Sequence, residues 1–221
     1  MTCAPRPAAI FDVDRTLLVR ESGEAGFLYL WKRRVVSPFF LLKVAAANQL
    51  YRRGLLSVQR ITEICVAYYR GRALAPFIEG AREFYEGWLR PIVCPIMRAK
   101  VEEHRRAGDL LVLLSASVDY YLKPLADDLG FDRLICSKLE TDADGVCTGR
   151  TAGPLLLGEH KLAAALKLAR EEGIDLAAST AYADHPTDLP LLEAVGHPVA
   201  VRPLKAFRAV ALARGWPIIE G

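Results

Sequence analysis

Two carboxylates stand one residue apart at the end of an apolar run near the N-terminus. Ala8 to Val13 has the composition of a buried strand, and Asp12 and Asp14 flank Val13. Residues two apart in a strand point to the same side, so both carboxylates would face one point. Two buried like charges are costly unless a cation neutralises them. The spacing therefore favours a divalent-metal and nucleophile site, although two aspartates can also end a strand and cap the next segment.

Further polar groups follow two later apolar runs. The run Leu110 to Leu114 is succeeded by Ser115 and Ser117, hydroxyls that stand where the next helix would begin. Hydroxyls beside a helix N-terminus suit an oxyanion or a phosphate. Another apolar run is succeeded by Asp184 and Asp188. Two more carboxylates would thus join the first pair.

Lys161 opens a helical pattern just after a glycine, where its ammonium would reach the same point. Each of these residues, taken alone, also has a purely structural interpretation. Ser115 would cap a helix, Lys161 would be a solvated lysine, and Asp184 with Asp188 would form a turn and the start of a helix. Together, several carboxylates, a hydroxyl and a lysine suit phosphoryl transfer to an aspartate. A metal would neutralise the acids, and the lysine and hydroxyl would hold the phosphoryl oxygens.

The elements that must position these groups alternate between strand and helix. Strand-like runs are expected at 8–13, 110–114, 134–136, 179–183 and 198–201, with helices between them and a β-hairpin at 138–150. This alternation predicts an α/β fold with a doubly wound parallel sheet. Ligands of such sheets bind beyond the carboxyl ends of the strands, and Asp12, Ser115 and Asp184 fall at or just past such ends.

A helical block interrupts the sheet after its first strand. Helical spacing without any strand-like run predicts helices at 24–34, 38–53, 58–70 and 76–88. We expect a small inserted helical bundle, a cap, at 19–90, and a core domain formed by 1–18 and 91–221.

The overall composition sets the remaining bounds. The 221 residues are 52% hydrophobic and 25% charged, as in a folded globular protein, and a net charge of +3 gives no indication of nucleic-acid binding. No Cys-x-x-Cys pair occurs, so neither a disulfide framework nor a zinc site is expected. The N-terminus lacks an apolar signal core, which predicts a cytoplasmic protein. The five cysteines, expected to be reduced, are Cys3, Cys65, Cys94, Cys136 and Cys147.

The order Asp12-x-Asp14-x-Thr16, Ser115, Lys161, Asp184-x-x-x-Asp188 resembles that of the haloacid dehalogenase superfamily of phosphohydrolases. The position and helical character of the insertion are similar to those of the phosphoserine-phosphatase-like members. The resemblance covers roughly 8–18 and 96–219, including the predicted hairpin, and is weak across the cap.

This resemblance implies roles for the acidic residues. Asp12 would be the nucleophile, forming an aspartyl-phosphate and also contacting Mg²⁺. Asp14 would protonate the leaving alcohol and then act as the base for water, which requires surroundings that separate the two pKa values. The expected metal site consists of Asp12, Asp14, the Val13 carbonyl, Asp184 and Asp188.

The resemblance also implies a set of substrate contacts. Ser115 and Ala116 would bind the phosphoryl group, Lys161 would neutralise it, and Thr16 would support the loop. Glu21 has a spacing similar to the cap glutamate that holds the amine of phosphoserine. Two places depart from the pattern: Arg15 stands where the family often has a small residue, and His185-Pro186 stand where small or polar residues are common. His185 is expected to be a local loop residue.

The substrate expected from the resemblance is a small phosphorylated metabolite such as phosphoserine or histidinol phosphate. In phosphoserine phosphatases an arginine binds the carboxylate of the substrate. The candidates for this arginine are Arg60 and Arg70, whereas the sequence register places Cys65 at its position. The cap is apolar and basic, which fits either a bundle core with a solvated basic face or a surface for anionic lipid. The second option makes a phospholipid headgroup, such as lysophosphatidate or phosphatidylglycerol phosphate, the substrate.

A third interpretation is a catalytically silent module that only binds a phospho-ligand. It is disfavoured because a binder would not need both Asp12 and Asp14. The longest apolar stretch, 35–50, is interrupted by polar residues and is too short to span a bilayer, which takes about 20 apolar residues. The oligomeric state is left open by the sequence.

Overall fold

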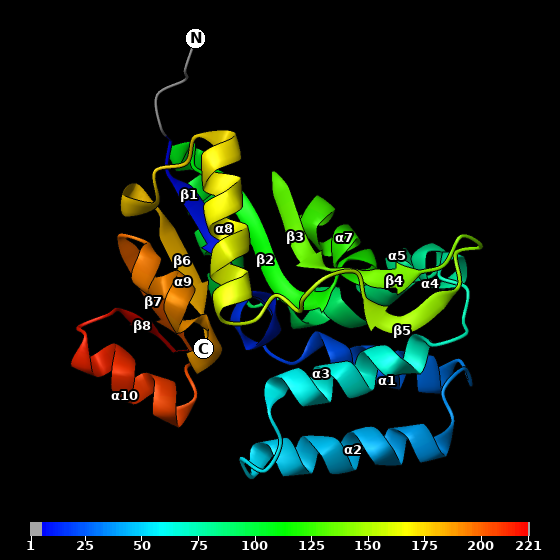
Figure 1. Ribbon diagram of the computed structural model, residues 1–221. Helices are drawn as coiled ribbons and strands as arrows, with labels where there is room; N and C mark the ends of the chain where they lie inside the picture. Colours follow the sequence, from blue (N-terminus) through cyan, green and yellow to red (C-terminus); the bar gives the residue numbers. More distant parts are fainter. Residues whose placement is uncertain (1–5, 221) are drawn as a thin grey trace.

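A six-stranded parallel sheet forms the centre of the protein (Figure 1). The computed structural model describes residues 6–220, so Cys3 lies outside the described residues. The strand order is β3-β2-β1-β6-β7-β8, and every neighbouring pair is parallel. The strands are β1 (Ala8–Phe11), β2 (Leu110–Val118), β3 (Arg133–Ser137), β6 (Thr180–Ala183), β7 (His197–Val201) and β8 (Ile218–Ile219). The predicted doubly wound α/β fold is confirmed.

Both faces of the sheet are buried, which explains the continuous apolar runs. Ala8 and Ile10 of β1 belong to one hydrophobic core, whereas Ala9 and Phe11 belong to the other, as the two-residue period of a strand requires. The first core is formed with α8 (Glu159–Glu172), α9 (Leu189–Ala194) and α10 (Lys205–Ala213), and the second with α6 (Pro95–Ala107) and α7 (Asp119–Asp128).

The helical cap follows β1 in the chain and lies beside the sheet, with α2 farthest from it (Figure 1). Its longer helices are α1 (Ser22–Lys32), α2 (Pro38–Arg52) and α3 (Val58–Val66). The side chains of Ser37 and Ser57 accept hydrogen bonds from the amides of Phe40 and Arg60, so each caps the helix that it precedes.

The prediction of one helix over 76–88 is wrong. The segment is divided into α4 (Ala75–Glu79), α5 (Ala81–Phe84) and a turn of π-helical hydrogen bonding at Tyr85–Leu89. Tyr85 and Leu89 are almost fully buried, so tertiary packing outweighs the local helical pattern here. The helix predicted at 58–70 likewise ends at Val66 and is followed by a single 3₁₀ turn.

The predicted hairpin is present and also holds the cap. Strands β4 (Leu139–Thr141) and β5 (Cys147–Thr151) pair antiparallel. The Gly71 amide donates to the Cys147 carbonyl at 2.8 Å, and the Cys147 amide donates to the Arg72 carbonyl at 2.8 Å. The cap is therefore connected to the core by backbone hydrogen bonds at this hairpin.

The four cysteines in the described part of the chain are free, and three of them, Cys94, Cys136 and Cys147, are buried. Within residues 6–220, no helix has both the length and the apolar character needed to cross a bilayer.

Candidate active site

The carboxyl ends of three neighbouring strands bring the predicted residues together. Asp12 directly follows β1, and Asp184 directly follows β6. The prediction that Ser115 ends its strand is wrong, because β2 continues to Val118. The pairing with β3 shifts register between Ser115 and Val118. Such an irregularity changes the direction in which side chains point, and Ser115 lines the same cavity as Asp12.

Lys161 lies between two carboxylates. Its Nζ is 2.7 Å from Oδ1 of Asp12 and 2.9 Å from Oδ1 of Asp188, and its side chain is only 2% exposed. Burial disfavours the ammonium, but the two carboxylates outweigh burial and raise the pKa of Lys161. Burial raises the pKa of Asp12, and Lys161 limits that rise. The lysine is therefore a fixed positive charge beside Asp12.

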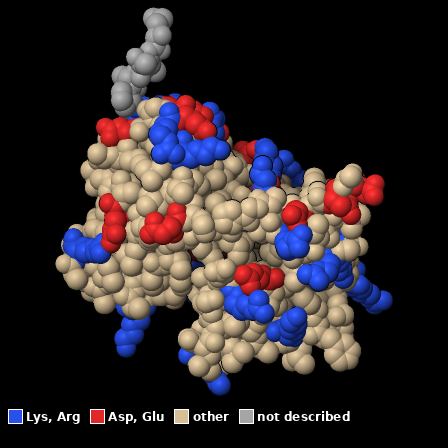
Figure 2. Space-filling model, in the orientation of Figure 1, with Lys and Arg blue, Asp and Glu red and all other residues tan. Residues whose placement is uncertain are grey.

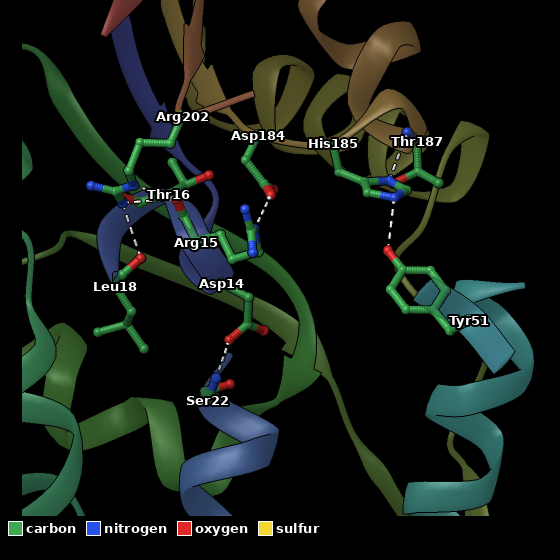
Figure 3. A network of polar contacts seen from close by, with 10 residues as sticks. All are labelled: Asp14, Arg15, Thr16, Leu18, Ser22, Tyr51, Asp184, His185, Thr187 and Arg202. Atoms are coloured by element: carbon green, nitrogen blue, oxygen red, sulfur yellow. Dashed lines mark hydrogen bonds and ion pairs between the residues drawn. The ribbon is translucent and has the colours of Figure 1, made fainter. Parts of the chain in front are cut away.

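The carboxylates of Asp12, Asp184 and Asp188 form a compact cluster. One oxygen from each lies within 4.8 Å of the others, and all three residues are buried. Burial, followed by the charges of Asp12 and Asp188, raises the pKa of Asp184 to about 8, although Arg15 lies 3.2 Å away (Figure 3). The cluster thus carries more negative charge than its cationic neighbours offset, and carboxylate oxygens are the ligands that Mg²⁺ prefers. The residues present fit a divalent cation.

Asp14 has a different kind of neighbour from Asp12. It accepts a hydrogen bond from the Ser117 hydroxyl at 2.6 Å. Figure 3 shows a second hydrogen bond, which Asp14 accepts from the backbone amide of Ser22. Burial raises the pKa of Asp14, and these two donors limit the rise. Asp12 is paired with an ammonium, whereas Asp14 is held by neutral donors. This difference favours the neutral acid at Asp14 and the carboxylate at Asp12.

Arg202 holds the loop between these aspartates and the cap. Its guanidinium donates to the carbonyls of Arg15 at 2.7 Å, Thr16 at 2.6 Å and Leu18 at 3.0 Å (Figure 3). Arg15 has a φ of 58°, a left-handed conformation that is unfavourable for residues with a Cβ. Arg202 was not predicted from the sequence, because no local pattern links it to a loop almost the whole chain away.

The other predicted residues are distributed around the site. Ala116 and Glu21 line the cavity. Thr16 is fully buried outside the cavity lining, and its Oγ1 has no hydrogen-bond partner among the described residues, which fits support of the loop rather than substrate contact. The Val13 carbonyl accepts from the Leu18 amide at 2.9 Å.

A cavity of about 1590 Å³ connects these residues with the cap. Tyr51 of α2 lies on its wall, and its hydroxyl is 3.0 Å from Nε2 of His185, which follows Asp184 (Figure 3). Cys65 also lines the cavity, whereas Arg60 and Arg70 are absent from the part of its lining that the structure describes. His185 is thus a contact between core and cap as well as a loop residue.

A model of the haloacid dehalogenase-like hydrolase family matches residues 9–193. The chain belongs to this family. It is 30% identical to a histidinol-phosphatase of Neisseria meningitidis, covering 96% of this chain and 97% of the relative, and 31% identical to a phosphoserine phosphatase of Mycobacterium tuberculosis, covering 96% and 70%. A crystal structure of a protein of unknown function from Bordetella pertussis matches with a TM-score of 0.86 and 29% identity, covering 98% and 99% of the two chains. The family resemblance and the expectation of an enzyme are confirmed.

Proposed function

We propose that the protein is a Mg²⁺-dependent phosphomonoester hydrolase that acts through an aspartyl-phosphate on Asp12. The observation that carries this proposal is the contrast between Asp12, which is paired with Lys161, and Asp14, which is held by Ser117 and Ser22. Two carboxylates in different surroundings can serve as nucleophile and proton donor at one pH.

In the first step, a carboxylate oxygen of Asp12 forms a bond to phosphorus, and the bond between phosphorus and the alcohol oxygen breaks. The carboxyl of Asp14 gives its proton to that oxygen. In the second step, Asp14 takes a proton from water as the water oxygen attacks phosphorus, and the bond to Asp12 breaks. The products are the alcohol, inorganic phosphate and the original enzyme.

Three residues would hold the metal, namely Asp12, Asp184 and Asp188, with Asp14 and the Val13 carbonyl as the further expected contacts. When bound, Mg²⁺ would neutralise charge that develops on the phosphoryl oxygens. Lys161 and the Ser115 hydroxyl would bind the other phosphoryl oxygens, and they need no reorganisation because both are already fixed in the buried site.

The alcohol part of the substrate depends on the cap. The names of the relatives support a small metabolite such as histidinol phosphate or phosphoserine. Glu21 on the cavity wall suits an amine, but neither predicted arginine is positioned there to bind a carboxylate. The predicted alternative, a phospholipid headgroup, gains support from the apolar cap. A silent binding module is disfavoured because both aspartates and Lys161 are in place.

The cap also supports the predicted contact with a membrane surface. Residues 27–62 contain seven Lys or Arg residues and no Asp or Glu. Phe39 and Leu42 of α2 and Leu55 after it are more than two-thirds exposed. On the face shown in Figure 2, the part of the molecule over α2 displays Lys and Arg side chains (blue) among uncharged residues (tan). A basic surface with exposed apolar side chains fits an anionic bilayer.

The decisive experiment measures phosphate release from an aryl phosphate with and without Mg²⁺. Asp12→Asn is expected to abolish turnover, and Asp142→Asn, an exposed change in the hairpin, is the matched control. Equal activity of Asp12→Asn and the wild type would refute the nucleophile assignment. A panel of phosphoserine, histidinol phosphate, sugar phosphates and lysophospholipids would then identify the alcohol.

A further inference from the structure

One wall of the active-site cavity is formed by the facing sides of α2 and α3. Helix α2 contributes residues at positions i, i+3, i+4, i+7 and i+10, which share one face of a helix. Helix α3 contributes an equivalent face. The lining residues are Leu41, Val44, Ala45, Asn48 and Tyr51 from α2 and Val58, Ile61, Thr62, Cys65 and Val66 from α3. Each helix therefore turns a mostly apolar face toward the space that the aspartates share.

The polarity of this wall changes along α2. Tyr51 lies at the catalytic end, where its hydroxyl contacts His185 next to Asp184. Asn48 follows, and then only Ala45, Val44 and Leu41 line the cavity. At 1.5 Å per residue, Leu41 and Tyr51 are about 15 Å apart along the helix. The α2 side of the wall is thus polar near the phosphoryl site and apolar at the far end.

The charged groups of the cavity lie on other walls. Away from the aspartates, the charged lining residues belong to α1, to the segments directly before and after it, and to α4 and α5. They are Arg20, Glu24, Arg33, Glu79 and Glu83. The α2–α3 wall is therefore an apolar surface within an otherwise mixed cavity, and water against it is displaced favourably by hydrocarbon.

The cap and the core are in contact in the conformation that contains this cavity. Ser22 of α1 contacts Asp14 and Ser117, Tyr51 contacts His185, and Gly71 pairs with the hairpin. The space is consequently a feature of the cap in contact with the core. About 1590 Å³ also exceeds the roughly 300–1,000 Å³ of ordinary ligand pockets. A small amino-acid phosphate would leave the apolar wall facing water.

We propose that the α2–α3 wall binds the hydrocarbon part of an amphiphilic phosphomonoester, whose phosphate lies at Asp12 and whose polar linkage lies near Asn48 and Tyr51. This inference rests on the proposed phosphatase activity and specifies its substrate class. The chemistry requires a primary phosphate on an alcohol with an extended apolar chain, whatever the source of that alcohol.

The test is hydrolysis of ethyl, butyl, hexyl and decyl phosphate, each below its critical micelle concentration. We expect kcat/KM to rise about two- to fourfold per added methylene until the wall is covered. In titration calorimetry, Asp12→Asn with Mg²⁺ should bind decyl phosphate more tightly than ethyl phosphate, with a negative heat-capacity change. This second measurement does not depend on turnover.

Adjacent leucines of α2 provide a matched pair of variants. Leu41 lines the cavity, whereas Leu42 points outward and is 69% exposed. Leu41→Asn should lower the ratio of decyl to ethyl kcat/KM at least about tenfold, and Leu42→Asn should preserve it. Ala45→Trp, which fills the space instead of adding polarity, should also lower the ratio. Because each ratio is measured in one preparation, partial unfolding does not alter it.

The outcomes separate this inference from the proposed function. Hydrolysis of all four phosphates with the same kcat/KM, or equal ratios in Leu41→Asn and Leu42→Asn, would overturn the inference and leave the phosphatase activity standing. Failure to hydrolyse any phosphomonoester in the presence of Mg²⁺ would instead refute the proposed function. Tighter binding of decyl phosphate by Asp12→Asn would still support the apolar wall in that case.

Discussion

Asp14 is the residue whose surroundings most clearly predict a proton-transfer role. Its carboxyl is held by one hydroxyl and one amide, and both donors fix its direction without a formal positive charge. Burial raises its pKa, so the proton needed by a departing alcohol is retained at higher pH than on an exposed aspartate. The Ser117 contact was not expected from the sequence, because the pattern indicated Ser117 only as part of a helix start.

Asp14→Asn should therefore slow alkyl phosphates more than aryl phosphates. An alkoxide needs protonation to leave, whereas a nitrophenolate leaves readily without it. We expect the first step with an alkyl phosphate to slow by about 10²–10⁴, the usual contribution of general acid catalysis, and the first step with nitrophenyl phosphate to slow much less. Single-turnover kinetics would measure both. An equal loss for the two leaving groups would contradict the assignment.

Asp184 makes the stability of the metal-free protein depend on pH. Burial and neighbouring carboxylates raise its pKa from 3.8 to about 8. Between these values the folded protein holds a proton that the unfolded chain has lost, so the free energy of unfolding should fall as pH rises through this range. Mg²⁺ requires the ionised carboxylates and should raise the melting temperature more at about pH 8 than at about pH 5.

Thermal unfolding of the wild type and of Asp184→Asn, each with and without Mg²⁺, would check this dependence. The variant should lose less stability between about pH 4 and pH 8 than the wild type, since it has no carboxyl to ionise there. If the stability of the metal-free wild type instead rose steadily over that range, the negative charge of the Asp184 carboxylate would be stabilised by other groups in the folded protein, and the prediction would be wrong.

At the scale of elements, the clearest connection between cap and core is the contact of α2 with the loop after β6. The Thr187 amide donates to Nδ1 of His185 at 3.1 Å, so the proton of the neutral ring lies on Nε2 and is donated to the Tyr51 hydroxyl. This bond joins the end of α2 to the segment next to Asp184. It should hold α2 over the catalytic end of the cavity.

Tyr51→Phe should consequently make the cap open more often. A net loss of about 0.5–1.5 kcal/mol for one hydrogen bond corresponds to roughly a two- to tenfold larger opening constant. Hydrogen exchange of the amides in α2 should accelerate by this factor, and KM should rise. Gln49→Ala, a change at an exposed position of the same helix, is the control. Identical exchange in Tyr51→Phe and the wild type would show that other contacts hold the helix.

Elements that are formed by local sequence patterns could be predicted from the sequence, whereas elements that depend on tertiary contacts could not. Strands β1 and β2 were predicted because burial on both faces requires continuous apolar runs. The bounds of the last cap helices were wrong because buried Tyr85 and Leu89 set the local winding through tertiary contacts. The pairing of Gly71 with Cys147 joins segments far apart in the chain and leaves no periodic signal in either.

The candidate site shows the same division. Asp12, Asp184 and Lys161 were predicted to meet because parallel strands end at one edge of the sheet, and the structure brings them together. Arg202 and Tyr51 reach the site through long side chains from elements whose orientation depends on the complete fold. The topology therefore determines where chemistry can occur, whereas packing determines which further side chains reach it.

At the scale of the whole molecule, charge is distributed unevenly between cap and core. The net charge is only +3, yet residues 27–62 carry seven basic and no acidic residues. In the described part of this segment, Arg33 and Arg60 have ion-pair partners, Glu83 and Glu63, while Lys43 lies exposed among the outward apolar side chains of α2. An anionic surface would therefore attract the molecule with its cap foremost.

The protein should co-sediment with vesicles that contain phosphatidylglycerol and remain free of vesicles of phosphatidylcholine alone. Each basic residue near an anionic leaflet contributes about 1 kcal/mol, so Lys43→Glu should weaken binding about tenfold or more. Lys167→Glu, an exposed change on α8 of the core, should bind like the wild type. Salt should release the bound protein, because screening shortens the range of the attraction. Equally strong binding to vesicles of phosphatidylcholine alone would refute an electrostatic attraction. Equal effects of Lys43→Glu and Lys167→Glu would refute an orientation set by the basic cap, because only an attraction directed through α2 distinguishes these two positions.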